Sequence, residues 1–125
     1  MKTLSLFILI LFTTISSFSQ KKKEEEIFTA VEQQAEFPGG MGVFGKYLQK
    51  NFKILKDSCQ SKIYVQFVVE KDGSPNRVQF LTKDTYQDTR DQLTKMILKV
   101  KWKPGYQNGK PVRSRFTIPM NFHCE

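Results

Sequence analysis

Hydrophobic and polar residues alternate most regularly near the C-terminus, between Val112 and Phe122. The even positions carry Val112, Phe116, Ile118, Met120 and Phe122, with Ser114 as the exception, and the odd positions carry Arg113, Arg115, Thr117, Pro119 and Asn121. A period of two predicts a β-strand with one buried and one polar face. Proline cannot donate a hydrogen bond to a neighbouring strand, so Pro119 indicates a strand at the edge of its sheet. Such an edge can accept a strand from another chain, which favours a binding function.

The middle of the chain contains the pattern of a β-hairpin. Residues Ile63–Val69 alternate between apolar and polar side chains, apart from the extra apolar residue Val68, and predict a strand with one buried face. Asp72-Gly73 supplies the residue types that a tight turn needs. The returning strand is expected over Arg77–Leu81.

Apolar residues recur at helical spacing in two other segments. The first predicts a helix over Met41–Phe52, directly after a Pro-Gly-Gly turn. Asp88 or Thr89 is expected to cap the second helix, and Thr89 with Gln92 matches a capping box. The apolar stripe of this second helix consists of Leu93, Met96, Ile97 and Val100.

The predicted elements follow the order helix, strand, strand, helix, strand. This order predicts a small two-layer α+β domain, with a three-stranded antiparallel sheet and two helices. Trp102 follows the second helix between two lysines. A tryptophan in such a place is expected to be a half-buried anchor of the core, with its N–H near water.

The N-terminal region has the pattern of an export signal. Lys2 is followed by a short apolar run and a tail rich in Ser and Thr, so we expect a signal peptide over residues 1–19. A block of Lys and Glu follows, which predicts a charged linker over residues 20–35. Residues 36–125 are then expected to form the folded domain.

Export changes how the charge and the cysteines are interpreted. The formal net charge is +8, but the lysines are scattered, so we favour a solvated basic surface over a nucleic-acid site. Cys59 lies before the first predicted strand and Cys124 after the last. If those strands are antiparallel neighbours, a disulfide between the two cysteines is geometrically possible, and two unpaired thiols are the alternative.

Residues for catalysis or cofactor binding are sparse. The window Gly40–Lys46 matches G-x-G-x-x-G and most of a phosphate-binding loop. No buried strand precedes it, however, and Tyr47 stands where Mg²⁺ binding requires Ser or Thr. The one histidine, His123, is adjacent to Cys124, and neighbours in a strand point to opposite faces. We therefore expect no enzyme activity, no cofactor and no metal site.

Five short motifs follow one another between Glu36 and Phe122. They are Glu36-Phe37-Pro38-Gly39-Gly40, Tyr64–Val69 with Asp72-Gly73, Trp102-Lys103-Pro104-Gly105, Asn108-Gly109-Lys110-Pro111-Val112 and Phe116-Thr117-Ile118-Pro119. In their order and spacing they resemble the TonB C-terminal domain family, in the form common among Bacteroidetes-type envelope proteins.

The resemblance implies a protein-binding role in the periplasm. TonB proteins couple the inner-membrane proton-motive force, through ExbB and ExbD, to outer-membrane receptors, and their C-terminal domain binds a short receptor segment by β-strand addition. Carried over to this chain, the partner-binding residues would be Val112, Arg113, Ser114, Arg115, Phe116, Thr117 and Ile118. Arg113, Arg115 and Thr117 would lie on the outer face of the strand.

The chain departs from an energy transducer in its N-terminal part. It shows no convincing anchor helix and no long Pro-rich spacer, and residues 20–36 reach at most roughly 60 Å when fully extended. The alternative is therefore a free, soluble periplasmic binding or adapter module of the same fold. An uncleaved signal segment would instead anchor the chain in the inner membrane, facing the periplasm. An exposed strand edge also allows a homodimer.

Overall fold

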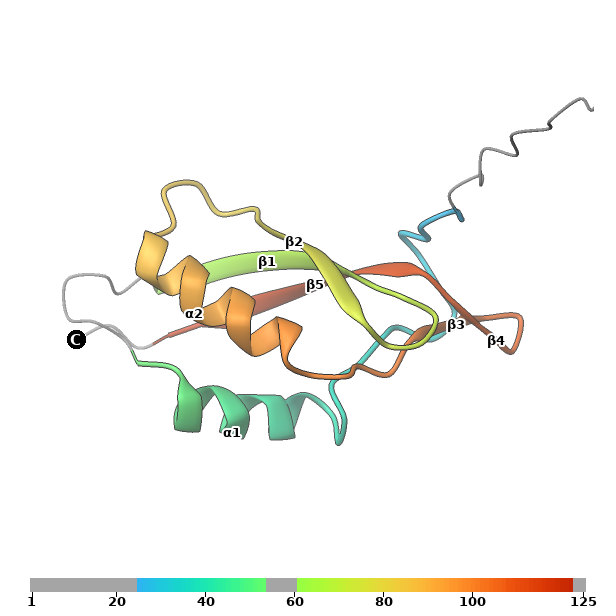
Figure 1. Cartoon of the computed structure of the whole chain (residues 1–125), viewed down its shortest axis with the longest axis horizontal. Helices are drawn as coiled ribbons and strands as arrows, with labels where there is room; N and C mark the ends of the chain where they lie inside the picture. Colours follow the sequence, from blue (N-terminus) through green and yellow to red (C-terminus); the bar gives the residue numbers. More distant parts are fainter. Residues whose placement is uncertain (1–24, 54–60, 123–125) are drawn as a thin grey trace, which may run out of the picture.

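A three-stranded antiparallel sheet, in the order β2-β1-β5, forms one layer of the structure (Figure 1). The computed structural model describes residues 25–53 and 61–122. The central strand β1 (Lys62–Val69) pairs with β2 (Pro75–Phe80) on one side and with β5 (Ser114–Asn121) on the other. With two helices on this sheet, the predicted two-layer α+β fold is confirmed.

Helices α1 (Met41–Asn51) and α2 (Gln87–Leu98) form the second layer. Helix α1 ends one residue earlier than the pattern predicted. Helix α2 follows Tyr86, and no side chain caps its N-terminus, so the expected cap at Asp88 or Thr89 is wrong. Thr89 is buried within the first turn of this helix, where its side chain is part of the helix surface turned to the protein interior.

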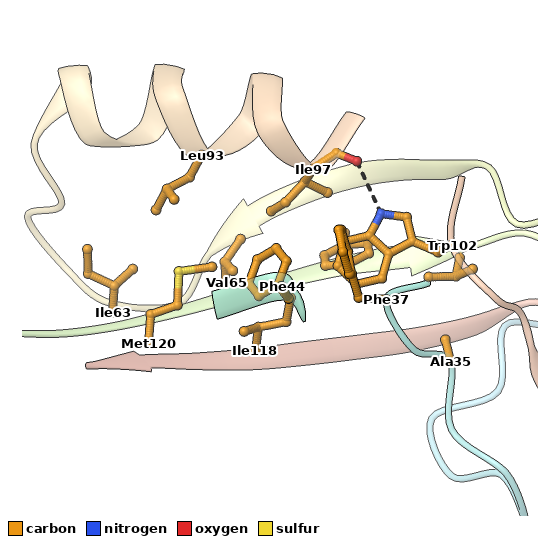
Figure 2. Packing of buried hydrophobic residues seen from close by; sticks show 12 residues of the cluster. Ala35, Phe37, Phe44, Ile63, Val65, Leu93, Ile97, Trp102, Ile118 and Met120 are labelled. Carbon is orange, nitrogen blue, oxygen red and sulfur yellow. Dashed lines mark hydrogen bonds between the residues drawn. The ribbon is translucent and has the colours of Figure 1, made fainter. Parts of the chain in front are cut away.

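The core lies between the helices and the inner face of the sheet (Figure 2). Trp102 is 2% exposed, and its indole Nε1–H donates a hydrogen bond to the carbonyl oxygen of Ile97 at 3.1 Å. The expectation of a half-buried ring with its N–H near water is therefore wrong. The indole packs against the rings of Phe37, Phe44, Phe67 and Phe116. Burial of the indole has little free-energy cost here, because the ring is surrounded by aromatic carbon and its one polar atom is hydrogen bonded.

The turn between β1 and β2 is fixed by contact with Trp102. Gly73 has a φ of +90°, and its carbonyl accepts a hydrogen bond from the Trp102 backbone N–H at 2.9 Å. A Cβ atom on this residue would lie 2.1 Å from the Trp102 carbonyl oxygen. Both the backbone conformation and the close approach therefore require glycine.

A second, two-stranded sheet was not predicted. Strand β3 (Gly105–Gln107) turns back into β4 (Lys110–Val112), and this hairpin extends beyond one end of the main sheet (Figure 1). Because β4 ends at Val112, the strand expected over Val112–Phe122 is divided at Arg113. From Ser114 onward the even positions are buried or half-buried, as the alternation predicted.

The segment ahead of α1 is attached to the domain, and we call residues 25–36 the N-terminal strap. Backbone bridges join Phe28 to Ser114, Gln33 to Tyr106 and Glu36 to Lys103. Ala35 is 2% exposed and belongs to the core. The division between linker and domain at residue 35 stays a prediction. The signal peptide, Cys59, His123 and Cys124 lie outside the described residues.

Candidate partner-binding site

Strand β5 lies at the edge of the main sheet, as Pro119 predicted. It pairs with β1 in continuous register, from Ser114 opposite Val69 to Asn121 opposite Lys62. The pairing contains no bulge. One side of β5 is therefore straight and fully hydrogen bonded, and the other side faces away from the sheet.

Two hydrogen bonds define which backbone groups face the open side. Phe122 donates its N–H to the carbonyl of Ser61, so even-numbered residues of β5 bond to β1. Arg115 donates its N–H to the carbonyl of Phe28, so odd-numbered residues point the opposite way. This outward set comprises the carbonyls of Arg115 and Pro119 and both backbone groups of Thr117 and Asn121. None of these has a hydrogen bond among residues 25–53 and 61–122, and we call them the open row.

The N-terminal strap covers the beginning of the edge. Phe28 donates its N–H to the Arg113 carbonyl at 2.8 Å and accepts a hydrogen bond from the Arg115 N–H at 2.9 Å. The outward backbone groups were expected to be free from Val112 onward. Those from the Arg113 carbonyl to the Arg115 N–H are instead hydrogen bonded to Phe28 of the same molecule. Among residues 25–53 and 61–122, no backbone group pairs with the outer side of β5 from the Arg115 carbonyl to Asn121.

Arg113 does not lie on the outer face, contrary to the expectation from the alternation. Its side chain is 10% exposed, and its Nε and Nη2 donate to the two carboxylate oxygens of Glu70 at 2.6 and 3.0 Å. Its Nη1 donates to the carbonyl of Glu25 at 2.6 Å. The guanidinium therefore joins the strap to the end of β1, and it has a structural role.

The partners of Glu70 determine its protonation. Burial alone raises the pKa of Glu70, but hydrogen bonds from Arg113 and Asn76 and the positive charges of Arg113 and Arg77 outweigh burial. The pKa of Glu70 is therefore lowered, and the carboxylate is ionised at neutral pH. An ionised Glu70 keeps Arg113 turned inward and the strap in place.

Of the other predicted residues, Val112 lies in β4, and the rest divide between the two faces of β5. Ile118 is 1% exposed and Phe116 packs its ring against Phe67 and Trp102, so both side chains serve the core. Arg115 and Thr117 are exposed on the opposite face, where Thr117 Oγ1 accepts a hydrogen bond from the Gln66 side chain. Of the predicted set, these two residues contribute to the open row.

An apolar groove beside the open row was missed in the sequence. It has a volume of about 180 Å³, and α1 forms one wall and the last half of β5 the other. Its lining residues are Met41, Phe44, Gly45, Leu48, Ile118, Pro119, Met120, Asn121 and Phe122. The helical spacing of the apolar residues predicted the helix over Met41–Phe52 and assigned no binding role to Met41 or Leu48. Met41 is nevertheless 45% exposed, and Phe44 is the residue of α1 that is buried.

A protein-family model described as Gram-negative bacterial TonB protein C-terminal matches residues 55–124, more than half of the chain. The chain belongs to the TonB C-terminal family. The match includes the whole main sheet, α2 and the β3–β4 hairpin, whereas α1 and the strap precede it. A comparison with curated proteins finds no match.

Membership in the TonB C-terminal family gives a coarse function. The family is a non-enzymatic, transport-associated one, which acts in the periplasm and interacts with outer-membrane receptors in general. Among the described residues, no three metal-ligating side chains gather at one place. Neither described helix has the length and hydrophobicity to cross a bilayer.

Proposed function

We propose that this TonB C-terminal domain binds an extended segment of an outer-membrane TonB-dependent receptor by adding it to β5. The observation that carries the proposal is the open row from the Arg115 carbonyl to Asn121. An unpaired row of N–H and C=O groups is a template for a further strand. The backbone would supply the hydrogen bonds, and the side chains beside it would supply selectivity.

The length of the open row is consistent with a reversible contact. Each backbone hydrogen bond formed with a partner contributes roughly 0.5–1.5 kcal/mol after exchange with water. Pro119 supplies no N–H, so the row lacks a donor near its middle. A short addition site of this kind favours release as well as binding, which suits a domain that has to engage receptors repeatedly.

Amide hydrogen exchange tests the proposal at single residues. A panel of peptides from the periplasmic N-terminal arms of outer-membrane receptors would be titrated into the purified protein. We expect a bound peptide to slow exchange of the Thr117 and Asn121 amides. The Arg115 amide is protected by Phe28 before any peptide is added and serves as an internal reference. Absence of protection with every peptide, or protection confined to β2, would contradict strand addition to β5.

Energy transduction is a separate step of the same proposal. Signal-peptide removal would yield a released module that binds receptor segments, whereas an uncleaved segment would yield an anchored transducer that works with ExbB and ExbD. Intact mass and membrane fractionation distinguish these two forms. An anchored chain whose deletion stops receptor-dependent uptake supports the transducer, and a chain that begins near Gln20 and fractionates with soluble proteins supports the module.

A further inference from the structure

We propose that the groove between α1 and β5 binds one apolar side chain of the added segment and thereby selects which segments bind. This inference rests on the proposed strand addition and names the chemistry that the site recognises. The occupant is a branched aliphatic or methionine side chain, on the face of the visiting strand that is turned toward α1.

The position of the groove follows from its two walls. Figure 1 shows α1 running beside β5, on the side away from β2. The β5 wall spans Ile118–Phe122, which includes the part of the open row at Pro119 and Asn121. A strand added there would lie next to the groove, and every second side chain would point toward the helical layer. The groove is therefore continuous with the proposed backbone contact.

The size and lining of the groove identify its occupant. A volume of about 180 Å³ is below the roughly 300 Å³ at which small-molecule sites begin. It is sufficient for one side chain of a peptide. Met41, Leu48 and Phe122 make the walls apolar, and a charged side chain would lose its hydration there without gaining an ion partner.

Gly45 adds no side chain to the α1 wall of the groove. A Cβ atom at this position would meet no atom within 4 Å, so packing within the protein does not require glycine. Glycine is less favourable than alanine inside a helix, so helix stability does not account for Gly45. The absence of a side chain at Gly45 leaves the space that the visiting side chain would fill.

Pro119 gives the groove a further role. It supplies only its carbonyl to the open row, so backbone bonding is weaker at Pro119 than at Thr117 or Asn121. An inserted apolar side chain contributes there through burial, which does not depend on backbone donors. Selectivity would thus be concentrated beside Pro119, where the backbone supplies a carbonyl and no donor.

The experiment compares two glycines of α1. Gly42 resembles Gly45, since a Cβ atom there also meets nothing within 4 Å, but Gly42 does not line the groove. The best-binding receptor peptide would be titrated against the wild type, Gly45→Ala, Gly45→Leu and the control Gly42→Leu. We expect about tenfold weaker binding with Gly45→Leu, a smaller loss with Gly45→Ala and no change with Gly42→Leu, which corresponds to about 1.4 kcal/mol for the leucine.

A second arm changes the peptide. Each apolar residue of the bound peptide would be replaced by alanine in turn. We expect alanine at one peptide position, on the face turned to α1, to cause most of the loss of affinity. In the Gly45→Leu protein, the same alanine substitution should cause no further loss. Unfolding curves of all variants would confirm that the fold is intact. If the folded Gly45→Leu protein bound the peptide with wild-type affinity and the peptide still protected the Thr117 amide, the proposed role of the groove would be wrong. Strand addition to β5 would then remain supported. Absence of any protection at Thr117 in the wild type would overturn both.

Discussion

The two edges of the sheet are built differently. Strand β5 pairs with β1 in continuous register, and its outer side is straight from Arg115 to Asn121. On the other edge, the pairing of β1 with β2 shifts register between Gln66 and Val68, and Arg77 in β2 has a φ of +53°. Bulges of this kind interrupt the row of backbone groups that a further strand would need.

Side chains reinforce the difference between the edges. Beside β2, the guanidinium of Arg90 lies 5.9 Å from the centre of the Phe80 ring, and charged residues of α2 line the adjoining groove. That groove has a volume of about 700 Å³, well above the 180 Å³ of the groove beside β5. The larger hollow thus adjoins the irregular edge and the smaller one adjoins the straight edge. Our proposal that β5 accepts a strand therefore rests on backbone geometry and not on cavity size.

The largest expected effect comes from removing Arg113, which anchors the strap at the start of β5. Arg113→Ala leaves Glu70 as a partly buried carboxylate that has lost its main partner. We expect a loss of about 3 kcal/mol in the free energy of unfolding, measured with urea. The Arg115 amide should also exchange faster, because the Phe28 contact loosens. Arg115→Ala is the matched control, since this exposed arginine should change stability by less than about 0.5 kcal/mol. Equal effects of the two substitutions would contradict the structural role of Arg113.

The second prediction concerns pH. The folded-state pKa of Glu70 is lowered, so its contribution to stability is present above the ordinary carboxyl pKa and is lost as pH falls through the folded value. Stability should therefore decline as the pH falls below the ordinary carboxyl pKa of 4.5, with the strap loosening first. Glu70→Gln should lower stability at pH 7 by about 2 kcal/mol and flatten this decline. A decline of the same size in wild type and variant would show that other carboxylates cause it.

The third prediction addresses the open row directly. Thr117→Pro removes an outward N–H without removing a bond to β1, and we expect receptor peptides to bind at least about tenfold more weakly. Thr117→Val is the control, because it keeps the N–H and removes the hydroxyl that Gln66 contacts. Circular dichroism would establish that both variants fold. If Val weakened binding as much as Pro, the side chain and not the backbone would be the contact.

The smallest expected effect comes from Pro119→Ala, which adds a donor to the open row. We expect peptide affinity to rise by about threefold, measured by titration calorimetry, since one further backbone hydrogen bond contributes roughly 0.5–1.5 kcal/mol. Self-association should increase as well, because proline is one means of preventing edge-to-edge pairing. Sedimentation at several concentrations would detect it. Unchanged affinity and an unchanged monomer would indicate that the Pro119 region does not contact the partner.

Much of the fold could be predicted from local patterns. The alternation after Ser114, the helical spacing in α1 and the Asp72-Gly73 turn each reflect a short-range rule, and each element forms where its rule placed it. The edge position of β5 followed from Pro119, because a missing donor has the same meaning in any sheet.

The site was predicted less completely. Arg113 was assigned to the polar face because its position fits the period of two. The period is broken there by the end of β4, and Glu70, which lies 43 residues earlier, draws the side chain inward. The strap and the groove were missed because local patterns do not distinguish Phe28 from an ordinary linker residue or Gly45 from an ordinary helix residue.

By itself, the sequence determined which residues of each element are apolar, where the chain turns and which strand has an incomplete set of donors. These properties depend on side-chain chemistry and on the period of the backbone, and both are set by residues close together in the sequence. Only the tertiary structure decided how far the β5 edge is open, because Phe28 and Glu25 reach the start of this edge from a distant part of the chain. It also decided that Gly73 must be glycine for the sake of Trp102, a contact between residues that no local pattern connects.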